Sequence, residues 1–396
     1  MVFDYSWLIG GPQGSGVDTA ANIFSRVGAK LGYHVFGKRE YHSNIKGLHS
    51  YFVVRLSRDN KVRSNVNGAN FMVAFDAETM IRHGLEILKD GAIIYDSSIV
   101  NTSIDEIPTI EVDHRVRLDE FFKSKNMEPK VSSIIELAKE SGVNVYPISF
   151  WDALSNIADE LKRPELSRMT RMFNVLGVSF SLGVLKAPIA PLLESIEEIF
   201  STKPTIADLN KKAANFAYNY ASAKFSGFNT SLNETDKEPN IMLVQGHQGS
   251  ALGKMVCGCR FQSYYPITPA SDESEFLETH EILQVKEDRP GSTTIVQTED
   301  EISAIGMAVG ASLTGTRSAT STSGPGFSLM AETLGWAAIN EVPVVISLFQ
   351  RSGPSTGLPT RHGQDDLLFA INAGHGEFPR IVYASGDVED SFYDTG

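Results

Sequence analysis

A threonine held between two prolines is the first candidate for chemistry in this sequence. Tyr265-Pro266-Ile267-Thr268-Pro269 follows a short stretch that favours a strand. Each proline fixes its own backbone φ and restricts the residue before it, so the Thr268 hydroxyl and the neighbouring carbonyls are held in one geometry. A loop of this rigidity suits substrate recognition. A strand-to-helix corner in which Thr268 and Ser271 cap the next helix explains the same residues equally well.

Two charged side chains further along the chain add to this candidate site. Glu301 opens a helical pattern directly after Gln297-Thr298-Glu299-Asp300, and Arg351 follows the apolar run 342–349. Ligands bind at the carboxyl ends of parallel strands in α/β sheets, and the planar guanidinium of Arg351 matches a carboxylate. Both residues also have a plain structural explanation. Acids in a first helical turn complement the helix dipole, and a lone arginine is usually a surface residue.

The helical pattern that begins at Glu301 has two faces of different character. Ile302, Ile305 and Val309 share an apolar stripe, whereas Gly306 and Gly310 form a flat neighbouring face that allows another backbone to come close. We therefore expect tight packing beside the start of this helix.

Glycine-rich segments stand at two expected junctions between a strand and a helix. Gly10-Gly11-Pro12-Gln13-Gly14-Ser15-Gly16 could bring backbone N–H groups close to a phosphate, but its spacing is not the dinucleotide-binding one, and tight turns use glycine anyway. Residues 320–326 end in Ser323-Gly324-Pro325-Gly326, which predicts a loop that is not helical. Residues 38–50 gather cations and donors in an expected loop, which suits an anionic ligand or a solvated face.

Composition and charge limit the class of protein. The 396 residues are enough for two or three domains, and the net charge of −13 argues against nucleic acid as a partner. Cys257 and Cys259 are the two cysteines, too few for an iron–sulfur cluster or a zinc site built by cysteines of this chain alone. The start has no signal-peptide pattern and the apolar run 175–185 is too short to span a bilayer, so we expect a cytoplasmic protein without membrane contact.

Alternating strand and helix patterns predict an α/β fold with two doubly wound, mainly parallel-sheet domains. Residues 227–240 are polar and rich in turn formers, which indicates a solvated linker between a first domain over 1–226 and a second over 241–396. Strands are expected at 7–9, 51–55, 71–75, 92–95, 143–146, 241–244, 293–297, 317–321 and 342–349, and helices at 20–31, 77–89, 132–140, 301–313 and 328–339.

Taken together, these motifs resemble the 2-oxoacid:ferredoxin oxidoreductase family. More narrowly, they resemble its large α subunit, in which a γ-type, Rossmann-like domain precedes the thiamine-pyrophosphate pyrimidine domain. The most specific features are the loop at 265–269 and Ser323-Gly-Pro-Gly326, and the segment 350–357 and the Glu301 helix agree with them. The glycines at 10–16 and the segment 39–50 also resemble the γ domain, so the resemblance covers most of the chain.

This resemblance implies oxidative decarboxylation of a 2-oxoacid, pyruvate and 2-oxoglutarate being examples, with coenzyme A. The products are acyl-CoA, carbon dioxide and electrons for ferredoxin. The cofactor would be thiamine pyrophosphate with Mg²⁺, shared with a β subunit that carries a [4Fe-4S] cluster. Glu301, nine residues before Gly310, matches the glutamate that hydrogen-bonds N1′ of the aminopyrimidine in thiamine enzymes.

The resemblance also implies ligands for the other residues. Tyr265-Pro266-Ile267 would contact the cofactor, Thr268 would hydrogen-bond the 2-oxoacid, and Arg351 would pair with its carboxylate. The sequence does not locate the coenzyme A site; Lys46 is named as a candidate for it from its cationic loop alone, and no residue of this chain is assigned to a metal. The preferred 2-oxoacid and the higher oligomeric state stay open, because pocket residues come from both subunits.

Two departures from the family pattern stand out. Gly246-His247 replaces the usual Gly-Asn, and the chain stops at Gly396, soon after the pyrimidine domain. We therefore expect that a further C-terminal domain is missing.

Two other functions remain open at this point. A nucleotide-dependent hydride-transfer dehydrogenase would use the glycines at 10–16, but it needs an acidic residue at the end of a strand about twenty residues later. A non-catalytic coenzyme-binding or assembly subunit would need only the N-terminal half. Reduction of a viologen dye by a 2-oxoacid, with thiamine pyrophosphate, magnesium and the β subunit present, separates these possibilities.

Overall fold

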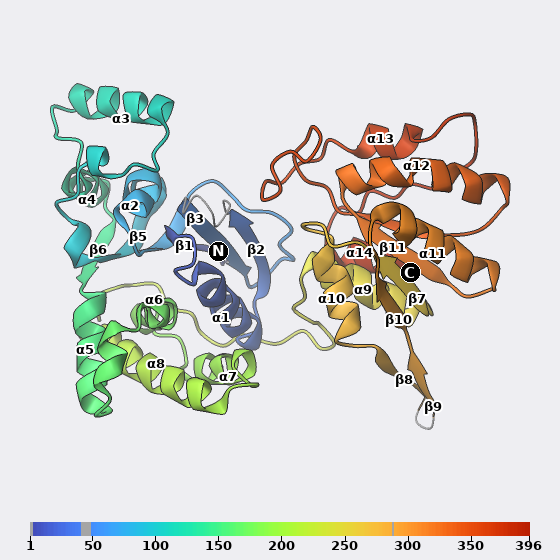
Figure 1. Cartoon of the computed structure of the whole chain (residues 1–396). Coiled ribbons are helices and arrows are strands. Elements are labelled where there is room, and N and C mark those ends of the chain that lie inside the picture. Colours follow the sequence, from blue (N-terminus) through green and yellow to red (C-terminus); the bar gives the residue numbers. More distant parts are fainter. Residues whose placement is uncertain (1–2, 41–48, 287–288) are drawn as a thin grey trace. The chain divides into compact units, whose positions relative to one another are not determined.

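The computed structural model describes residues 3–40, 49–286 and 289–396. The chain folds into two compact units, Met1–Leu243 and Val244–Gly396. Each unit has its own sheet with helices packed against it, as Figure 1 shows. The predicted α/β fold class is confirmed. None of the helices in these described ranges has the length and apolar content that crossing a bilayer requires.

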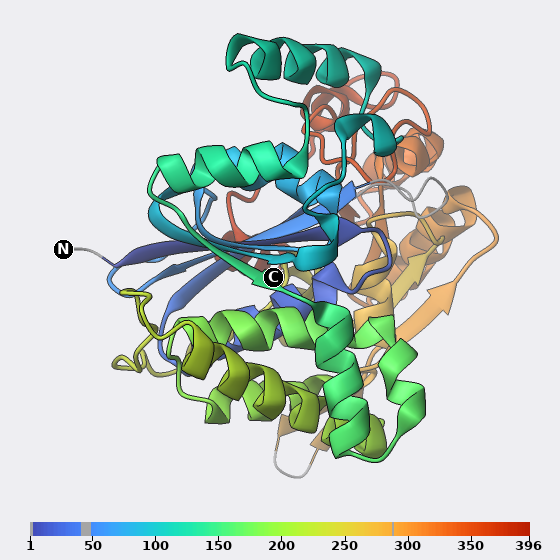
Figure 2. The same cartoon turned by 90° about the vertical axis from the view of Figure 1, so that its left-hand side faces the viewer.

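The first unit contains a mixed sheet between two layers of helices (Figure 2). Its strands are β1 (Asp4–Pro12), β2 (His34–Glu40), β3 (His49–Ser57), β4 (Ala69–Ala74), β5 (Ile87–Asp96) and β6 (Asn144–Ile148). Its helices are α1 (Val17–Lys30), α2 (Ala77–His83), the 3-10 turn η2 (Gly84–Glu86), α3 (Val112–Ser124), α4 (Val131–Glu140), α5 (Phe150–Glu160), α6 (Phe173–Val184), α7 (Ala190–Ile199) and α8 (Pro204–Lys224).

The strand order of this sheet is β2-β3-β1-β4-β5-β6. Strands β1, β4, β5 and β6 run parallel, whereas β3 is antiparallel to both β1 and β2. The expected mainly parallel sheet is therefore confirmed, with β3 as the strand of opposite direction among the described strands of this unit. The physical reason lies in the connection: eight residues separate β2 from β3, fewer than the dozen or so that a parallel crossover needs.

Side chains alternate between the two faces of the sheet and so create two cores. Trp7 and Ile9 point into the larger core, which α1, α5, α6 and α8 complete, and Leu8 points into the smaller one beside α2 and α4. Trp7 stacks on Phe24 at 4.3 Å between ring centroids, and its indole N–H donates to Ser181 Oγ at 3.0 Å. The apolar run noted above forms α6, a helix that is buried on all sides.

The start of the expected linker differs from the prediction. Phe228 and Leu232 are buried in the larger core of the first unit, and the backbone N–H of Leu232 donates to the carbonyl of Leu185 at 2.9 Å. A segment with so few apolar residues reads as solvated from composition, but these two residues are enough to attach it. The boundary between the units falls after Leu243.

The second unit has a parallel sheet with the order β10-β7-β11-β12. Its strands are β7 (Phe261–Tyr264), β8 (Ile282–Lys286), β9 (Arg289–Ser292), β10 (Thr294–Gln297), β11 (Ser318–Thr322) and β12 (Val345–Leu348), of which β8 and β9 form a separate hairpin. Its helices are α9 (Gly246–Val256), α10 (Ser271–Glu278), α11 (Glu301–Leu313), α12 (Gly324–Ile339), α13 (Leu367–Asn372) and α14 (Val388–Thr395).

Most of the predicted elements are present, and the differences have local causes. The helix expected over 77–89 ends at His83, after which η2 leads into β5. Residues 241–244 are not a strand, since an apolar run of four residues does not by itself specify one. The loop expected over 38–50 is strand at both of its described ends, in β2 and β3.

Candidate active site

The loop Tyr265–Pro269 joins β7 to α10 at the carboxyl end of a central strand of the second unit. β7 pairs in parallel with β10 on one side and β11 on the other. Tyr265, Pro266 and Thr268 are exposed, and Ile267 is half-buried. The four residues assigned to cofactor and substrate are thus accessible in this unit.

Arg351 ties this loop to the segment that follows β12. Its Nη1 donates to the carbonyl of Thr268 at 2.8 Å, and its Nη2 donates to the carbonyl of Thr356 at 3.0 Å. The side chain is 8% exposed. Burial lowers the pKa of Arg351, and the carboxylates of Asp366 and Glu301 oppose that effect, so the arginine stands in the field of both acids.

Glu301 is the first residue of α11 and is 6% exposed. The cap of this helix is Asp300, whose carboxylate accepts from the backbone N–H of Ser303 at 2.7 Å. Asp300 therefore caps the helix, which is the structural role that an acid at a helix start usually has. The Glu301 side chain packs against Gly326, where an added Cβ would lie 2.6 Å from Oε1.

The helix that carries Gly326 begins earlier than expected. Ser323-Gly324-Pro325-Gly326 was predicted as a non-helical loop, but α12 starts at Gly324. That prediction was wrong because the N–H groups of a first helical turn have no partner within the helix. A proline therefore fits there without the loss of a hydrogen bond.

Three buried polar atoms around this turn have no hydrogen-bond partner among the described residues: Ser323 Oγ, Arg351 Nε and Asp366 Oδ2. The Asp366 carboxylate lies against the start of α12, since a Cβ added to Gly324 would be 2.8 Å from Oδ2. Burial, then the charge of Asp365, raises the pKa of Asp366. Unsatisfied buried polar groups are costly, so three of them around one turn leave hydrogen-bonding capacity for a ligand or water.

A fully buried ion pair lies between the elements that carry the loop. Lys254 Nζ is 2.6 Å from Glu273 Oε2, and their side chains are 2% and 0% exposed. Lys254 also donates to Gln262 Oε1 at 2.9 Å. Because these residues belong to α9, α10 and β7, the network holds both ends of the loop Tyr265–Pro269.

Sequence reasoning missed several of these residues. The motif that contains Ser323 does not by itself indicate a role for this residue, and no local pattern points to Asp366, Lys254 or Glu273. The Asp-Asp pair before the apolar Leu367-Leu368 resembles a helix cap, so nothing local distinguishes Asp366 from an ordinary one. Its side chain makes no cap hydrogen bond.

Packing along α11 differs from its predicted pattern. Ile305 and Val309 are buried, but Ile302 is exposed, because the buried face is completed by Ala304 and Ala308 instead. A Cβ added to either glycine of this helix, Gly306 or Gly310, would meet no described atom within 4 Å, so their face lies open in this unit.

The departure at His247 lies in the first turn of α9, and its ring is half-buried. Burial lowers the pKa of His247, and the nearby acids Asp272, Glu273 and Glu275 oppose this.

In the first unit, the glycine-rich turn is filled by side chains of the unit itself. Gly16 stands before α1 with φ of 85°, and a Cβ there would lie 2.7 Å from Asn174 Nδ2. A Cβ on Gly11 would meet Ser15 Oγ and Phe75. This crowding favours the structural explanation of the turn over a phosphate site. Lys46 lies outside the described residues.

Comparison with known families gives two matches that together span most of the chain. The family described as pyruvate ferredoxin/flavodoxin oxidoreductase matches residues 6–220. The thiamine diphosphate-binding region of pyruvate flavodoxin/ferredoxin oxidoreductase matches residues 252–396.

Individual relatives agree with these families. The chain is 44% identical over 394 residues to the 2-oxoacid:ferredoxin oxidoreductase 1 subunit alpha of Sulfurisphaera tokodaii and 45% identical over 395 residues to the corresponding alpha subunit of Saccharolobus solfataricus. Each match covers 98% of this chain and 61% of the relative, so the chain spans about three fifths of their length.

A solved structure is similar over nearly the whole chain. The 2-oxoglutarate:ferredoxin oxidoreductase from Magnetococcus marinus, with 2-oxoglutarate, coenzyme A and succinyl-CoA bound, has a TM-score of 0.74 and 29% sequence identity. The match covers 99% of this chain and 60% of that one.

Proposed function

Because this chain belongs to the pyruvate ferredoxin/flavodoxin oxidoreductase family, we propose that it is the α subunit of a 2-oxoacid:ferredoxin oxidoreductase. The reaction would be the oxidative decarboxylation of a 2-oxoacid with coenzyme A, with electrons passed to ferredoxin. Its two units would be the γ-type domain and the pyrimidine-binding half of the thiamine pyrophosphate site. A further C-terminal domain would account for the remaining length of the relatives.

The residues of the second unit fit the pyrimidine half of this cofactor. Glu301 is a buried carboxylate held beside a glycine that leaves no room for a side chain, and Ser323, Arg351 and Asp366 each keep one polar atom without a protein partner. When bound, thiamine pyrophosphate supplies the carbon nucleophile and the electron sink for decarboxylation. The residues of this chain would hold the aminopyrimidine ring in place and fix the position of its exchangeable proton.

Glu301 would accept a hydrogen bond from, and exchange a proton with, N1′ of the aminopyrimidine. A buried and positioned carboxylate suits this role because proton transfer needs hydrogen-bond reach and a fixed geometry. The observation that carries the proposal is the burial of this side chain against Gly326, in the electrostatic field of Arg351.

Thr268 and Arg351 would orient the 2-oxoacid. The carbonyl of Thr268 is already engaged by Arg351, so its exposed hydroxyl is the group left for the substrate. Arg351 donates one hydrogen bond from each Nη to a backbone carbonyl, and its Nε has no partner among the described residues. Nε would therefore donate to the substrate carboxylate. Tyr265, Pro266 and Ile267 would contact the cofactor.

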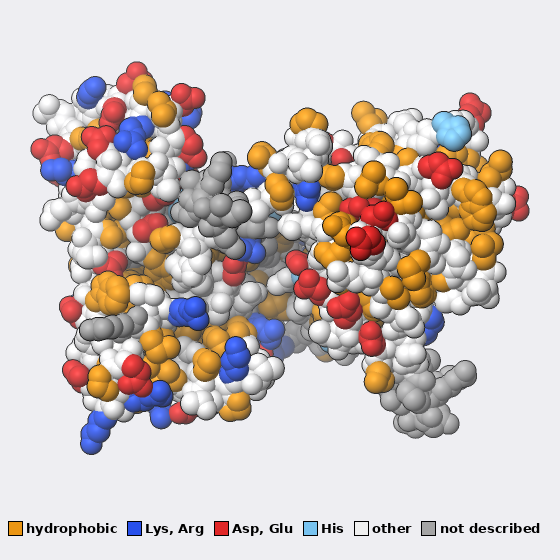
Figure 3. Space-filling model, viewed as in Figure 1, with side chains coloured by type: hydrophobic (Ala, Val, Ile, Leu, Met, Phe, Trp, Pro, Cys, Tyr) orange, Lys and Arg blue, Asp and Glu red, His pale blue; other side chains and the backbone are white. Residues whose placement is uncertain are grey.

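A β subunit would supply the pyrophosphate-binding half, the Mg²⁺ site and the [4Fe-4S] cluster. Hydrophobic side chains gather over α11 and α12 on the face seen in Figure 3. These two helices carry exposed large apolar residues, among them Ile302, Leu329, Trp336 and Ile339. Apolar patches of this kind mark protein interfaces. This face is our proposed contact with the β subunit, in a cytoplasmic complex that ferredoxin reaches.

Coenzyme A is the proposed acyl acceptor, and Lys46 is retained as a candidate contact. The Magnetococcus protein has coenzyme A and succinyl-CoA bound, and the similarity to it supports coenzyme A as a substrate of the present protein.

The test reconstitutes the full α subunit with its β subunit, thiamine pyrophosphate and Mg²⁺, and follows dye or ferredoxin reduction by pyruvate and by 2-oxoglutarate. Glu301→Gln should lower kcat by about 10²- to 10⁴-fold, the contribution expected of a positioned acid–base group. The matched control is Glu299→Gln, an exposed acid two residues away, which should keep kcat within twofold. Equal activity of the two variants would refute the role of Glu301.

A further inference from the structure

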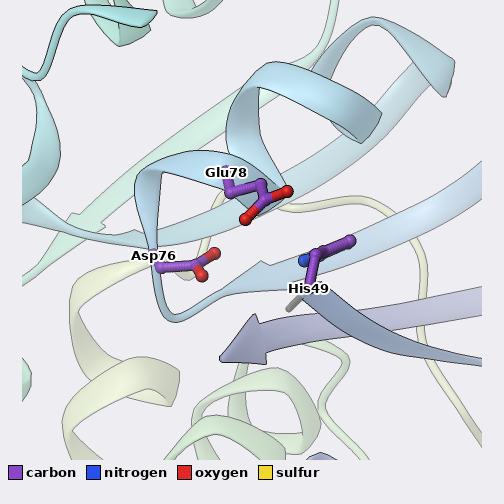
Figure 4. Close-up of side chains that lie close together, drawn as sticks. All are labelled: His49, Asp76 and Glu78. Atoms are coloured by element: carbon purple, nitrogen blue, oxygen red, sulfur yellow. The ribbon is translucent and has the colours of Figure 1, made fainter. Parts of the chain in front are cut away.

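A cluster of one histidine and two acids, of which His49 and Glu78 are buried and Asp76 is half-buried, lies at the carboxyl ends of β1 and β4 in the first unit. His49 is the first residue of β3, Asp76 immediately precedes α2, and Glu78 lies in the first turn of α2 (Figure 4). Their ligand atoms, a ring nitrogen and two carboxylate oxygens, all lie within 4.8 Å of one another. Within the described ranges, no other trio of histidine, cysteine or acidic side chains meets this condition.

We propose that His49, Asp76 and Glu78 bind one divalent first-row transition ion of the Zn²⁺ type. Imidazole and carboxylate are donors that such ions accept, at metal–ligand distances of about 2.0–2.2 Å. Ligand atoms of one tetrahedral ion are then about 3.3–3.6 Å apart, so side-chain movement of up to roughly an ångström closes the site. The proposal is independent of the function proposed for the second unit.

The histidine is oriented by a chain of polar groups behind it. His83 Nδ1 lies 2.8 Å from Glu86 Oε2, and His83 Nε2 lies 3.1 Å from His49 Nε2. A proton held between His83 Nδ1 and Glu86 leaves His83 Nε2 to accept from His49. The lone pair of His49 then stands on Nδ1. Metal-binding histidines typically carry such a partner on their other ring nitrogen.

The two acids are also held in place by neighbours. Asp76 Oδ1 accepts from the backbone N–H of Thr79 at 2.9 Å, and Glu78 Oε1 accepts from Arg82 Nε at 2.8 Å. Glu78 Oε2 accepts from the hydroxyl of Thr109. Because each carboxylate oxygen has two acceptor positions, these hydrogen bonds are compatible with a metal on the same groups.

The space beside the histidine is made by a glycine. A Cβ on Gly10 would lie 3.2 Å from His49 Cε1 and 2.8 Å from Thr79 Oγ1. His49 also stacks on Tyr51, with ring centroids 5.6 Å apart. The ring is therefore packed on several sides, which favours a preformed site.

The charge of the surroundings favours a cation. Arg82 pairs with both Glu78 and Glu111, and Glu86 pairs with His83. With neutral histidines, Asp76, Glu78, Glu86 and Glu111 give four negative charges against the single positive charge of Arg82, a sum of −3. A dication would stabilise both carboxylates in their ionised form.

The test uses the full chain, stripped of metal with a chelator, and measures Zn²⁺ binding by calorimetry in the absence of thiamine pyrophosphate and Mg²⁺. The wild type should bind one ion per chain. Asp76→Asn should weaken binding by at least about 100-fold while it keeps α2 capped, since asparagine also caps helices. His49→Ala should have a similar effect.

Two controls separate this site from unrelated ones. His34→Ala removes a half-buried histidine of the same unit that faces a single acid, Glu238, and should leave binding unchanged. Cys257→Ser removes the more accessible thiol and should also leave binding unchanged. Absence of binding by the wild type, or unchanged affinity in Asp76→Asn, would overturn the proposal even if His49→Ala fails to fold.

Discussion

Each unit contains a glycine-rich turn where a strand of its sheet meets a helix, and the two turns have different surroundings. In the first unit, the space beside Gly16 is occupied by Asn174, a residue of the same unit. In the second, the space beside Gly326 is occupied by Glu301, and the neighbouring Ser323 and Asp366 keep polar atoms without partners. The first turn is crowded by its own packing, although Ser15 Oγ there also has no partner among the described residues, and the second turn is surrounded by three such atoms, on Ser323, Arg351 and Asp366.

The difference shows what a glycine motif does and does not indicate. Glycine is required at both turns, at Gly16 by a positive φ and at Gly326 by the close approach of another side chain. The requirement itself therefore carries no functional information. The chemistry depends on whether the space that glycine leaves is taken by a structural amide or by a carboxylate that has a further task.

The comparison is tested most severely at Gly326. Gly326→Ala would place a Cβ 2.6 Å from Glu301 Oε1 and close to Thr322 Oγ1, so the carboxylate must move. We expect kcat of the reconstituted enzyme to fall by about 100-fold, because displacements near 1 Å have effects of that size. Gly335→Ala is the control in the same helix, where nothing lies within 4 Å, and it should leave kcat unchanged. Wild-type kcat in Gly326→Ala would mean that Glu301 is not positionally constrained.

Arg351 tests whether the unused polar atoms serve the substrate. Arg351→Ala should raise KM for the 2-oxoacid by about 10- to 100-fold, the size of a lost hydrogen bond to a charged group, with a smaller change in kcat. Steady-state kinetics measures both constants.

Arg380→Ala is the matched control for this change. Arg380 also donates to two backbone carbonyls in the same unit, those of Ala370 and Ala373. Arg380→Ala should lower the free energy of unfolding without any change in KM. If both variants alter KM equally, the effect of Arg351 is structural.

The smallest effect is expected in the first unit and concerns stability alone. Gly16→Ala forces a left-handed φ, which costs about 1–2 kcal/mol, and adds a clash with Asn174. Gly14→Ala imposes a similar φ with nothing within 4 Å, so it isolates the backbone cost.

In denaturant unfolding, Gly16→Ala should therefore have a lower free energy of unfolding than Gly14→Ala. KM and kcat of the reconstituted enzyme should be unchanged in both variants. A change in either constant for Gly16→Ala alone would give the first turn a functional role after all.

Local patterns were sufficient for much of this fold. The helix Glu301–Leu313 was predicted with its observed bounds, because its periodicity and the acid before it are local signals. The antiparallel position of β3 was not predicted, since strand order depends on which edges meet in the folded sheet. The burial of Phe228 and Leu232 was missed for the same reason, because the core that receives them is distant in sequence.

The features of the candidate site also fall into those that local sequence determines and those that depend on the tertiary structure. The types and order of Thr268, Glu301 and Arg351, with the prolines that stiffen the loop, were determined by the amino-acid sequence itself. Only the tertiary structure decided that Arg351 holds the Thr268 carbonyl, that Gly326 makes room for Glu301, and that His49 meets two acids. Side-chain chemistry and backbone restriction are properties of single residues and their neighbours. Distances between groups far apart in the chain exist only after the sheet has brought its strands together.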